Sequence, residues 1–316
     1  MPETTTLPTP AQLQMLALCR IDGLDWRLVA REGQRPGGLE RLLQGEVSEA
    51  SAQAEQMKVA LRVGLPKLEA LLEELMPSIE LASSRGARLT TVLDDDYPAN
   101  LRTIYNLPPF LFYRGDLRSE DAYGVAVVGT RQASDEGRRR AAQMTRALVE
   151  RGVTILSGLA RGIDTVAHQV AVSSAGRTVA VVGTGILKTY PSENAELAER
   201  IVESGGAIVS QFVPLQPPTS YNFPRRNVVM SGIGQGTVVI EASRTSGAKM
   251  QARYSLEHGR KVFLLQSLVT SQPWALGYLS RGAIEVASVD DVTSRLRSAE
   301  SLVTHAGELR ALSAML

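Results

Sequence analysis

Three apolar runs, each ending in a turn of small residues, constrain the fold of this chain most. Val125–Val128 runs into Gly129–Arg131, and the same transition recurs at Ser157–Asp164 and Val181–Gly185. A parallel sheet is buried on both faces, so its strands read as continuous apolar runs and not as alternating patterns. The sequence therefore predicts an α/β fold with a mostly parallel sheet.

Strand-like and helix-like segments alternate from about residue 123 to residue 289. We predict strands near Val125–Val128, Thr154–Ser157, Thr178–Val182, Ala207–Ser210, Thr237–Glu241, Val262–Leu265 and Ile284–Ala287. Another short apolar strand is expected near Leu107–Tyr113, after the prolines that interrupt this part of the chain. In the helix expected after Arg131, Ala141, Met144 and Leu148 share one face. Three consecutive arginines, 138–140, lie largely elsewhere, where they either contact nucleic acid or, as is usual for charge runs on helices, form a solvated face without a ligand.

The pattern divides the chain into three parts. Residues 1–90 read as a helical N-terminal domain, in which Gly23 interrupts the first helical pattern. That turn fits a helix-hairpin-helix or SAM-like element, although a plain helical bundle explains it as well. Residues 91–290 form the predicted Rossmann-like domain. Residues 291–316 read as a short helical tail, too short for a winged-helix domain.

Charge and cysteine content narrow the function classes. With 34 basic and 33 acidic residues the net charge is +1, so any site for a polyanion must be local. Cys19 is the sole cysteine and there are three histidines, which argues against a disulfide or a Cys/His metal site. No segment reads as a membrane span or a leader, so we expect a soluble, cytoplasmic protein that needs no cofactor.

The turns after the apolar runs are suited to bind anions. Ligands of open α/β sheets collect at the carboxyl ends of the strands, where helix N-termini offer free N–H groups. Arg131 and Arg161 each follow such a turn, and a guanidinium grips a phosphate with two hydrogen bonds. We therefore expect a phosphate-binding site at this edge of the sheet.

Seven short motifs, in order, resemble the DNA-processing protein A (DprA/Smf) family. They are Gly129–Arg131, Ser157–Asp164 with Ala167-His168, Tyr190-Pro191, Phe223–Asn227, Val239–Ala242, Ser246-Gly247 and Gly259–Phe263. The resemblance covers about residues 97–287. It implies an extended Rossmann-like domain that binds single-stranded DNA in a basic pocket, forms a homodimer and helps to load RecA recombinase in natural transformation.

Single strands are held by phosphate contacts and base stacking, so the matched positions suggest specific contacts. The predicted nucleic-acid-binding residues are Gly129, Thr130, Arg131, Ser157, Gly158, Arg161, Gly162, Lys188, Phe223, Arg225, Arg226, Asn227 and Lys249. Among the cations, Lys188 and Arg225 are second-rank candidates, because their side chains could equally well face solvent without a ligand. Phe223 is either a stacking platform or a core residue. Asn227 contacts a base or its own loop, or caps a helix beginning near Val228.

No catalytic residue is predicted. Asp164 and His168 lie four residues apart, as an acid/base pair would, but no nucleophile accompanies them and a helix-start aspartate commonly caps. Glu241 ends a predicted strand and is expected to orient an arginine.

Departures from the family pattern keep an alternative open. Val228 replaces an arginine, Gln211 an acidic residue, and Gln266 the first residue of a Pro-Gly pair. In addition, residues 234–237 with Glu241 loosely resemble the signature of the LOG-like phosphoribohydrolases. That likeness implies a nucleotide-derivative sensor or hydrolase in place of a DNA-binding protein.

Overall fold

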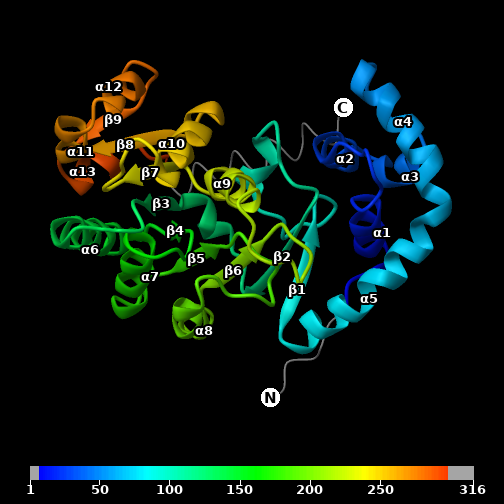
Figure 1. Ribbon diagram of the computed structural model, residues 1–316, viewed down its shortest axis with the longest axis horizontal. Coiled ribbons are helices and arrows are strands. Elements are labelled where there is room, and N and C mark those ends of the chain that lie inside the picture. Colours follow the sequence, from blue (N-terminus) through cyan, green and yellow to red (C-terminus); the bar gives the residue numbers. More distant parts are fainter. Residues whose placement is uncertain (1–6, 298–316) are drawn as a thin grey trace.

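The computed structural model describes residues 7–297, and within them the strands form one nine-stranded sheet (Figure 1). The strand order is β1-β2-β6-β5-β4-β3-β7-β8-β9. The strands are β1 (Ala87–Thr91), β2 (Phe110–Gly115), β3 (Val125–Val128), β4 (Ile155–Ser157), β5 (Thr178–Val181), β6 (Ala207–Ser210), β7 (Gly236–Val239), β8 (Lys261–Leu265) and β9 (Ile284–Val286). Strands β3 to β9 are parallel to one another, which confirms the predicted α/β class and mostly parallel sheet.

Helices cover both faces of the parallel strands. Figure 1 shows α7 and α8 on one side of the sheet and α9 and α10 on the other. The helices are α1 (Pro10–Leu18), α2 (Trp26–Gly33), α3 (Gly38–Leu43), α4 (Ala52–Gly64), α5 (Leu68–Ser84), α6 (Asp135–Val149), α7 (Ile163–Ser173), α8 (Ala195–Glu203), α9 (Asn222–Ile233), α10 (Gly247–Glu257), α11 (Gln266–Ser271), α12 (Trp274–Leu279) and α13 (Val289–Thr293).

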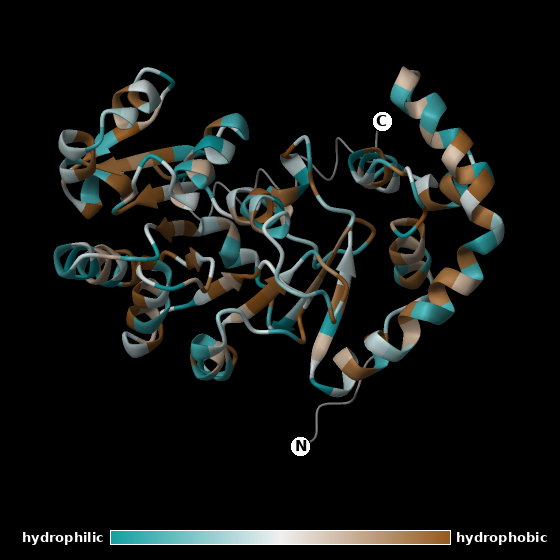
Figure 2. Cartoon of the chain, in the orientation of Figure 1, coloured by the Kyte–Doolittle hydropathy of each residue, from teal (hydrophilic) through white to brown (hydrophobic). Residues whose placement is uncertain are grey.

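The core explains why the strand signal was so strong. Every residue of β3 is buried, as are those of β5, β6 and β7, and Figure 2 shows these strands in brown between helices with hydrophilic outer faces. Burying Val and Ile side chains contributes roughly 1.5–3 kcal/mol each. Within the described residues the N-terminal helices share the same hydrophobic cluster, where the Trp26 and Phe110 rings lie 5.2 Å apart.

Two antiparallel strands extend the sheet toward the helical N-terminal part. β1 pairs with β2, and β2 pairs with β6, both antiparallel. The sequence predicted β2 but not β1, because a five-residue strand containing Arg88 and two threonines gives a weak apolar signal. The last helix of the N-terminal part ends at Ser84, so the boundary expected at residue 90 falls inside β1.

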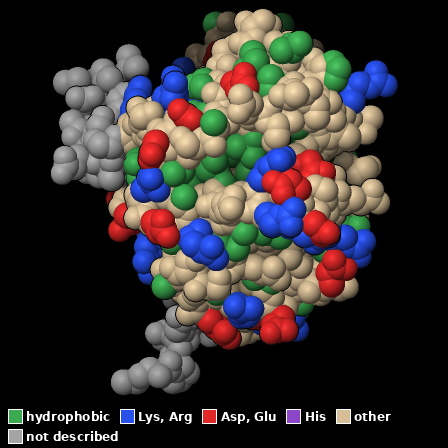
Figure 3. Space-filling view, turned by 90° about the vertical axis from the view of Figure 1, so that its left-hand side faces the viewer, with side chains coloured by type: hydrophobic (Ala, Val, Ile, Leu, Met, Phe, Trp, Pro, Cys, Tyr) green, Lys and Arg blue, Asp and Glu red, His purple; other side chains and the backbone are tan. Residues whose placement is uncertain are grey.

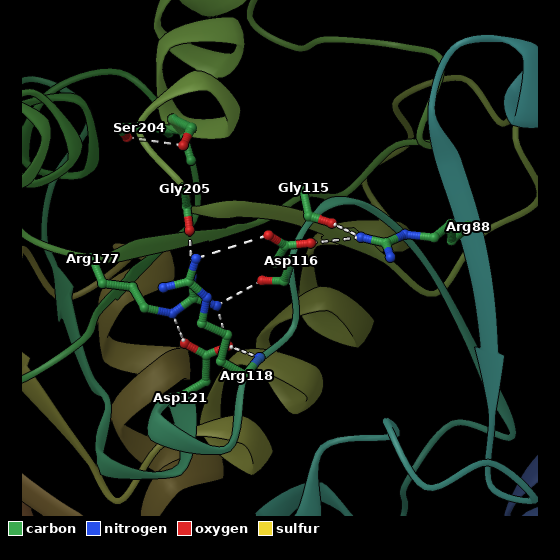
Figure 4. Close-up of polar contacts among 9 residues, drawn as sticks. Arg88, Gly115, Asp116, Arg118, Asp121, Arg177, Ser204 and Gly205 are labelled. Carbon is green, nitrogen blue, oxygen red and sulfur yellow. Dashed lines mark hydrogen bonds and ion pairs between the residues drawn. The ribbon is translucent and has the colours of Figure 1, made fainter. Parts of the chain in front are cut away.

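An ion-paired cluster ties this extension to the parallel sheet (Figure 4). The Arg177 guanidinium donates to both carboxylate oxygens of Asp121, at 2.6 and 2.7 Å, and to the Asp116 carbonyl at 2.6 Å. It also donates to the carbonyl of Gly205. Asp116 in turn accepts from Arg88 of β1 at 2.8 Å. The cluster therefore joins three loops at the amino ends of the parallel strands to the first strand.

Two sequence expectations concern the ends of the chain and membrane segments. The tail expected from residue 291 begins inside α13, and residues 298–316 lie outside the described residues. Among the helices of residues 7–297, none combines the length and the apolar character needed to cross a bilayer.

Candidate nucleic-acid interface

A pocket of about 550 Å³ opens at the carboxyl ends of β3 and β7. β4 lies on one side of β3 and β7 on the other, so the chain changes direction across the sheet at this point. Such a switch leaves a crevice between the loops, where open α/β sheets bind ligands. We call it the switch-point pocket. Seven predicted site residues line it: Gly129, Thr130, Arg131, Arg161, Phe223, Arg226 and Asn227.

Arg131 lies over the ring of Phe223. Its guanidinium carbon is 5.1 Å from the ring centroid, and the side chain is exposed. No hydrogen bond or ion pair occupies the guanidinium within residues 7–297. Phe223 is half-buried and its ring centroid lies 5.9 Å from that of Tyr190. A planar cation resting on an aromatic face is held in place while its N–H groups remain available to an anion.

Arg226 forms the inner wall of the pocket. It is 6 % exposed, and its Nη1 donates to the carbonyl of Val181 at 3.0 Å. Burial lowers the pKa of Arg226, while the negative charge of nearby Asp164 opposes that effect. The Asp164 carboxylate itself accepts from the backbone N–H of Gly158 at 3.1 Å. A charge this deeply buried is stable only with partners of this kind.

Close backbone packing shapes the turn after β4. Gly162 has φ +78°, and a Cβ there would lie 2.3 Å from the carbonyl oxygen of Thr130. Only glycine fits a left-handed position with another backbone this close. The Thr130 N–H donates to the Glu241 carbonyl at 2.7 Å, so three turns are held together. The close approach that was predicted between Gly162 and a ligand is thus an approach between Gly162 and the backbone of Thr130.

Arg161 also lines the pocket, but an acidic residue holds it. Its guanidinium donates to both carboxylate oxygens of Glu193, at 2.9 and 2.7 Å. The two side chains are 63 % and 53 % exposed. An exposed pair of this kind contributes little to stability and opens readily to other partners.

Besides Gly162, five of the predicted site residues do not line the pocket. Ser157 is buried and donates its hydroxyl to the Val127 carbonyl at 2.7 Å. Gly158 lies behind Arg226. Lys188 is exposed on the loop after β5. The ammonium of Lys249 lies 5.6 Å from the ring centroid of Trp274, and Arg225 faces the other side of α9.

The helix that contains Phe223–Asn227 begins earlier than the helix near Val228 that Asn227 was expected to cap. α9 starts at Asn222, so Asn227 lies inside the helix and cannot cap a helix beginning near Val228. The Pro224 ring is tolerated because it falls in the first turn, where N–H groups have no helical acceptor. Phe223, Arg226, Asn227 and Met230 then share the face that lines the pocket.

Sequence reasoning missed part of the lining. The residues not proposed as contacts are Val128, Gln132, Ala160, Asp164, Met230, Ser243, Thr245, Ser246, Gly247, Ala248 and Gln251. Most belong to the turn after β7 and the start of α10. The available signal was Ser246-Gly247, a helix-capping pair after an apolar strand, and the Ser246 hydroxyl does accept from the N–H of Ala248 at 3.2 Å.

The candidate acid/base groups are engaged elsewhere. His168 is fully buried, its Nδ1 lies 2.8 Å from the Thr178 hydroxyl, and burial lowers its pKa to about 3. Glu241 follows β7, which ends at Val239 and not at residue 241 as predicted. Its carboxylate accepts from the N–H and hydroxyl of Ser134, at 3.2 and 2.9 Å, at the start of α6. No group of three or more potential metal ligands occurs among residues 7–297.

The departures from the family pattern lie outside the switch-point pocket. Val228 and Gln211 line a different pocket, and Gln266 begins α11 beside α6. The face that includes α6, α11 and α13 intersperses basic with acidic side chains (Figure 3). On α6, Arg139 and Arg140 both pair with Glu136, at 2.6 and 2.9 Å, as expected for a solvated helix face.

Comparison with known proteins places this architecture among DNA-processing proteins. The model of the family DNA recombination-mediator protein A matches residues 88–297. Protein Smf of Escherichia coli is 41 % identical over 204 residues, which are 64 % of this chain and 54 % of that protein. DNA processing protein DprA of Streptococcus pneumoniae is 38 % identical over 175 residues, 55 % of this chain and 61 % of the relative. The chain thus spans less than two thirds of these relatives.

Solved structures agree with the sequence match. The structure of DNA processing protein A from Streptococcus pneumoniae superposes with a TM-score of 0.72 at 27 % identity, covering 93 % of this chain and all of that one. DNA processing protein A from Helicobacter pylori, whose single-stranded DNA binding mode has been studied structurally, has a TM-score of 0.57 at 20 % identity. It covers 69 % of this chain and 97 % of its own, and it shows the shared fold.

Proposed function

Since this chain belongs to the DNA recombination-mediator protein A family, we propose that its switch-point pocket binds single-stranded DNA. One observation carries the proposal: Arg131, with no other partner among the described residues, lies on Phe223 in front of the buried Arg226. This arrangement offers two guanidinium groups to phosphates and an aromatic edge to bases. Single-strand binding without sequence preference requires those two elements.

The opening of the pocket suits a polymer. Gln132 and the turn at 243–247 border it together with Arg131, so a strand has backbone and hydroxyl donors along its path. Arg161 adds a third guanidinium at the rim once Glu193 is displaced. The name of the Streptococcus pneumoniae relative, DNA processing protein DprA, supports DNA as the ligand, as does the single-strand binding studied in the Helicobacter pylori protein.

Binding without catalysis fits the placement of the acidic groups. A LOG-like hydrolase needs a carboxylate directed at the ribose, but Glu241 is bound to Ser134 outside the pocket lining. Asp164 is buried behind Arg226, and burial raises its pKa.

The cellular role follows from the family. We propose that the protein acts in the cytoplasm as a homodimer and delivers single strands to a RecA-type recombinase during DNA uptake and natural transformation. The family's description as a recombination mediator supports this role. A co-sedimentation assay of recombinase with coated single strands, in the presence and absence of this protein, tests the loading step.

The binding proposal is tested by Arg131→Ala and Arg226→Ala. Each removes a charge-assisted phosphate contact and should weaken binding roughly tenfold or more, by a similar factor for all sequences. Arg200→Ala, on the exposed face of α8, is the matched control and should leave the affinity unchanged. Unchanged affinity in both pocket variants would refute the assignment of this pocket.

A further inference from the structure

A second pocket lies on the opposite side of α9. It has a volume of about 550 Å³ and opens between the start of α2, the segment preceding β2, and the N-terminal end of α9. Its lining includes Trp26, Arg27, Tyr221 and Arg225. We call it the junction pocket, because the helical N-terminal part and the Rossmann-like part both contribute to it.

Arg225 occupies this pocket much as Arg131 occupies the first. Its guanidinium carbon lies 4.5 Å from the ring centroid of Trp26, 5.5 Å from that of Phe212 and 5.6 Å from that of Tyr221. Within residues 7–297 no carboxylate pairs with it and no hydrogen bond occupies it. Three rings hold the guanidinium plane, while its N–H groups have no acceptor in the part of the chain that the structure describes.

The surrounding groups favour an anionic, aromatic ligand. Tyr221 is 71 % exposed, so its ring is available for stacking beside the cation. The one acidic side chain of the lining, Asp25, is bound by the guanidinium of Arg27 at 2.5 Å and caps α2. Gln211 is 5 % exposed, and its amide nitrogen has no acceptor among the described residues. A cation, an exposed ring and an unused amide donor together fit a nucleotide.

Helix α9 connects the two pockets. Arg225 and Arg226 are consecutive residues, so their side chains leave the helix about 100° apart and enter different pockets. Tyr221, one turn before Arg225, places its ring beside that arginine, and Phe223 of the same turn places its ring under Arg131. A single strand crossing the N-terminal turn of α9 therefore meets the same pair of groups twice.

We propose that the junction pocket is a second binding site for the same single strand, with Arg225 on a phosphate and Tyr221 under a base. The proposal rests on single-strand binding at the switch-point pocket and adds the helical N-terminal part to the DNA-binding surface. It also explains why the chain keeps two adjacent arginines whose side chains face apart.

The test compares a short and a long oligothymidylate, of about 5 and about 20 nucleotides, by fluorescence anisotropy. The short strand fills the switch-point pocket, and the long one reaches both. Arg225→Gln should weaken the long strand about tenfold and leave the short one unchanged. It should also reduce the salt dependence of long-strand binding by about 0.7 in log–log slope, the loss of one phosphate contact. Arg200→Gln serves as the control.

A second measurement reads the site directly. A long strand carrying 5-iodouracil should photo-crosslink to Tyr221, and Tyr221→Ala should remove that crosslink while Phe223 crosslinks persist. Arg225→Lys keeps the charge without the planar fork and should fall between wild type and Arg225→Gln. Thermal melts confirm that each variant is folded.

The outcomes separate the two proposals. Equal losses for both lengths in Arg225→Gln, or no loss for either, would overturn the junction site while the switch-point site stands. If Arg226→Ala loses short-strand binding while Arg225→Gln keeps it and loses only long-strand affinity, both the switch-point site and the junction site are supported. If the wild-type protein binds neither strand, both proposals fail.

Discussion

The guanidinium of Arg226 occupies the space in which any side chain at Gly158 would have to fit. A Cβ at Gly158 would lie 1.4 Å from Arg226 Nη1 and 2.5 Å from Nη2. Gly158 N–H in turn donates to Asp164, which faces the same guanidinium. Gly158 therefore serves the pocket indirectly, because it leaves room for the Arg226 guanidinium that lines it.

Gly158→Ala should displace Arg226 and weaken single-strand binding about as much as Arg226→Ala does. The new methyl group also crowds a packed interior, which typically costs about 1–3 kcal/mol of stability. Anisotropy and urea unfolding measure the two effects. Gly277→Ala is the control, because a Cβ at Gly277 meets nothing within 4 Å. Wild-type affinity in Gly158→Ala would mean that Arg226 does not bind the strand.

Arg177→Met should destabilise the fold without changing the pocket. The substitution leaves the Asp121 carboxylate buried and unpaired, and loss of one partner of a buried pair costs about 3–5 kcal/mol. The cluster (Figure 4) lies at the amino ends of the parallel strands, whereas the switch-point pocket lies at the carboxyl ends of β3 and β7. Urea unfolding should show the loss, and strand affinity at 10 °C below the melting transition should match wild type. A loss under 1 kcal/mol would contradict the role given to this cluster.

Glu193→Gln should strengthen single-strand binding several-fold. The change removes a negative charge at the rim and frees Arg161 from its ion pair. Stability should hardly change, since exposed ion pairs contribute little to it. Arg161→Ala should abolish the gain. If Glu193→Gln binds no tighter at low salt, Arg161 does not contact the strand.

Acid should destabilise the protein through His168. Burial lowers its folded-state pKa from 6.5 to about 3, so the unfolded chain takes up the proton first. Stability is therefore fully present above about pH 6.5 and falls as the pH drops toward 3, by about 1.4 kcal/mol per pH unit. His168→Gln removes this titration, and the stability difference from wild type should narrow on acidification. A pH-independent difference would refute the assignment.

The sequence predicts the parallel sheet well, because buried strands have an unmistakable apolar pattern. It fails at β1, where pairing with β2 and packing against α1 and α5 stabilise a strand of weak apolar pattern. The end of β7 is another case. The sequence predicts Glu241 as the last residue of this strand, but the strand ends at Val239. The Glu241 carboxylate instead accepts a hydrogen bond from the Ser134 hydroxyl.

The position of the candidate site residues was predictable where a motif follows a strand. Arg131 and Arg161 sit where the βα turns indicated. Arg225 could not be assigned without the start of α9, because a shift in the helix start rotates every side chain by 100° per residue. Lys249 is similar: its place over Trp274 depends on how α10 packs against α12, which no local pattern encodes.

The most direct test of the account is anisotropy of a labelled single strand over a salt series, with duplex DNA and mononucleotides as competitors. Several phosphate contacts predict a steep fall of affinity with salt, about 0.7 in log–log slope per contact. We expect tight, salt-steep binding to the single strand that mononucleotides displace poorly. Weak strand binding together with saturable, salt-insensitive binding of a mononucleotide would contradict it.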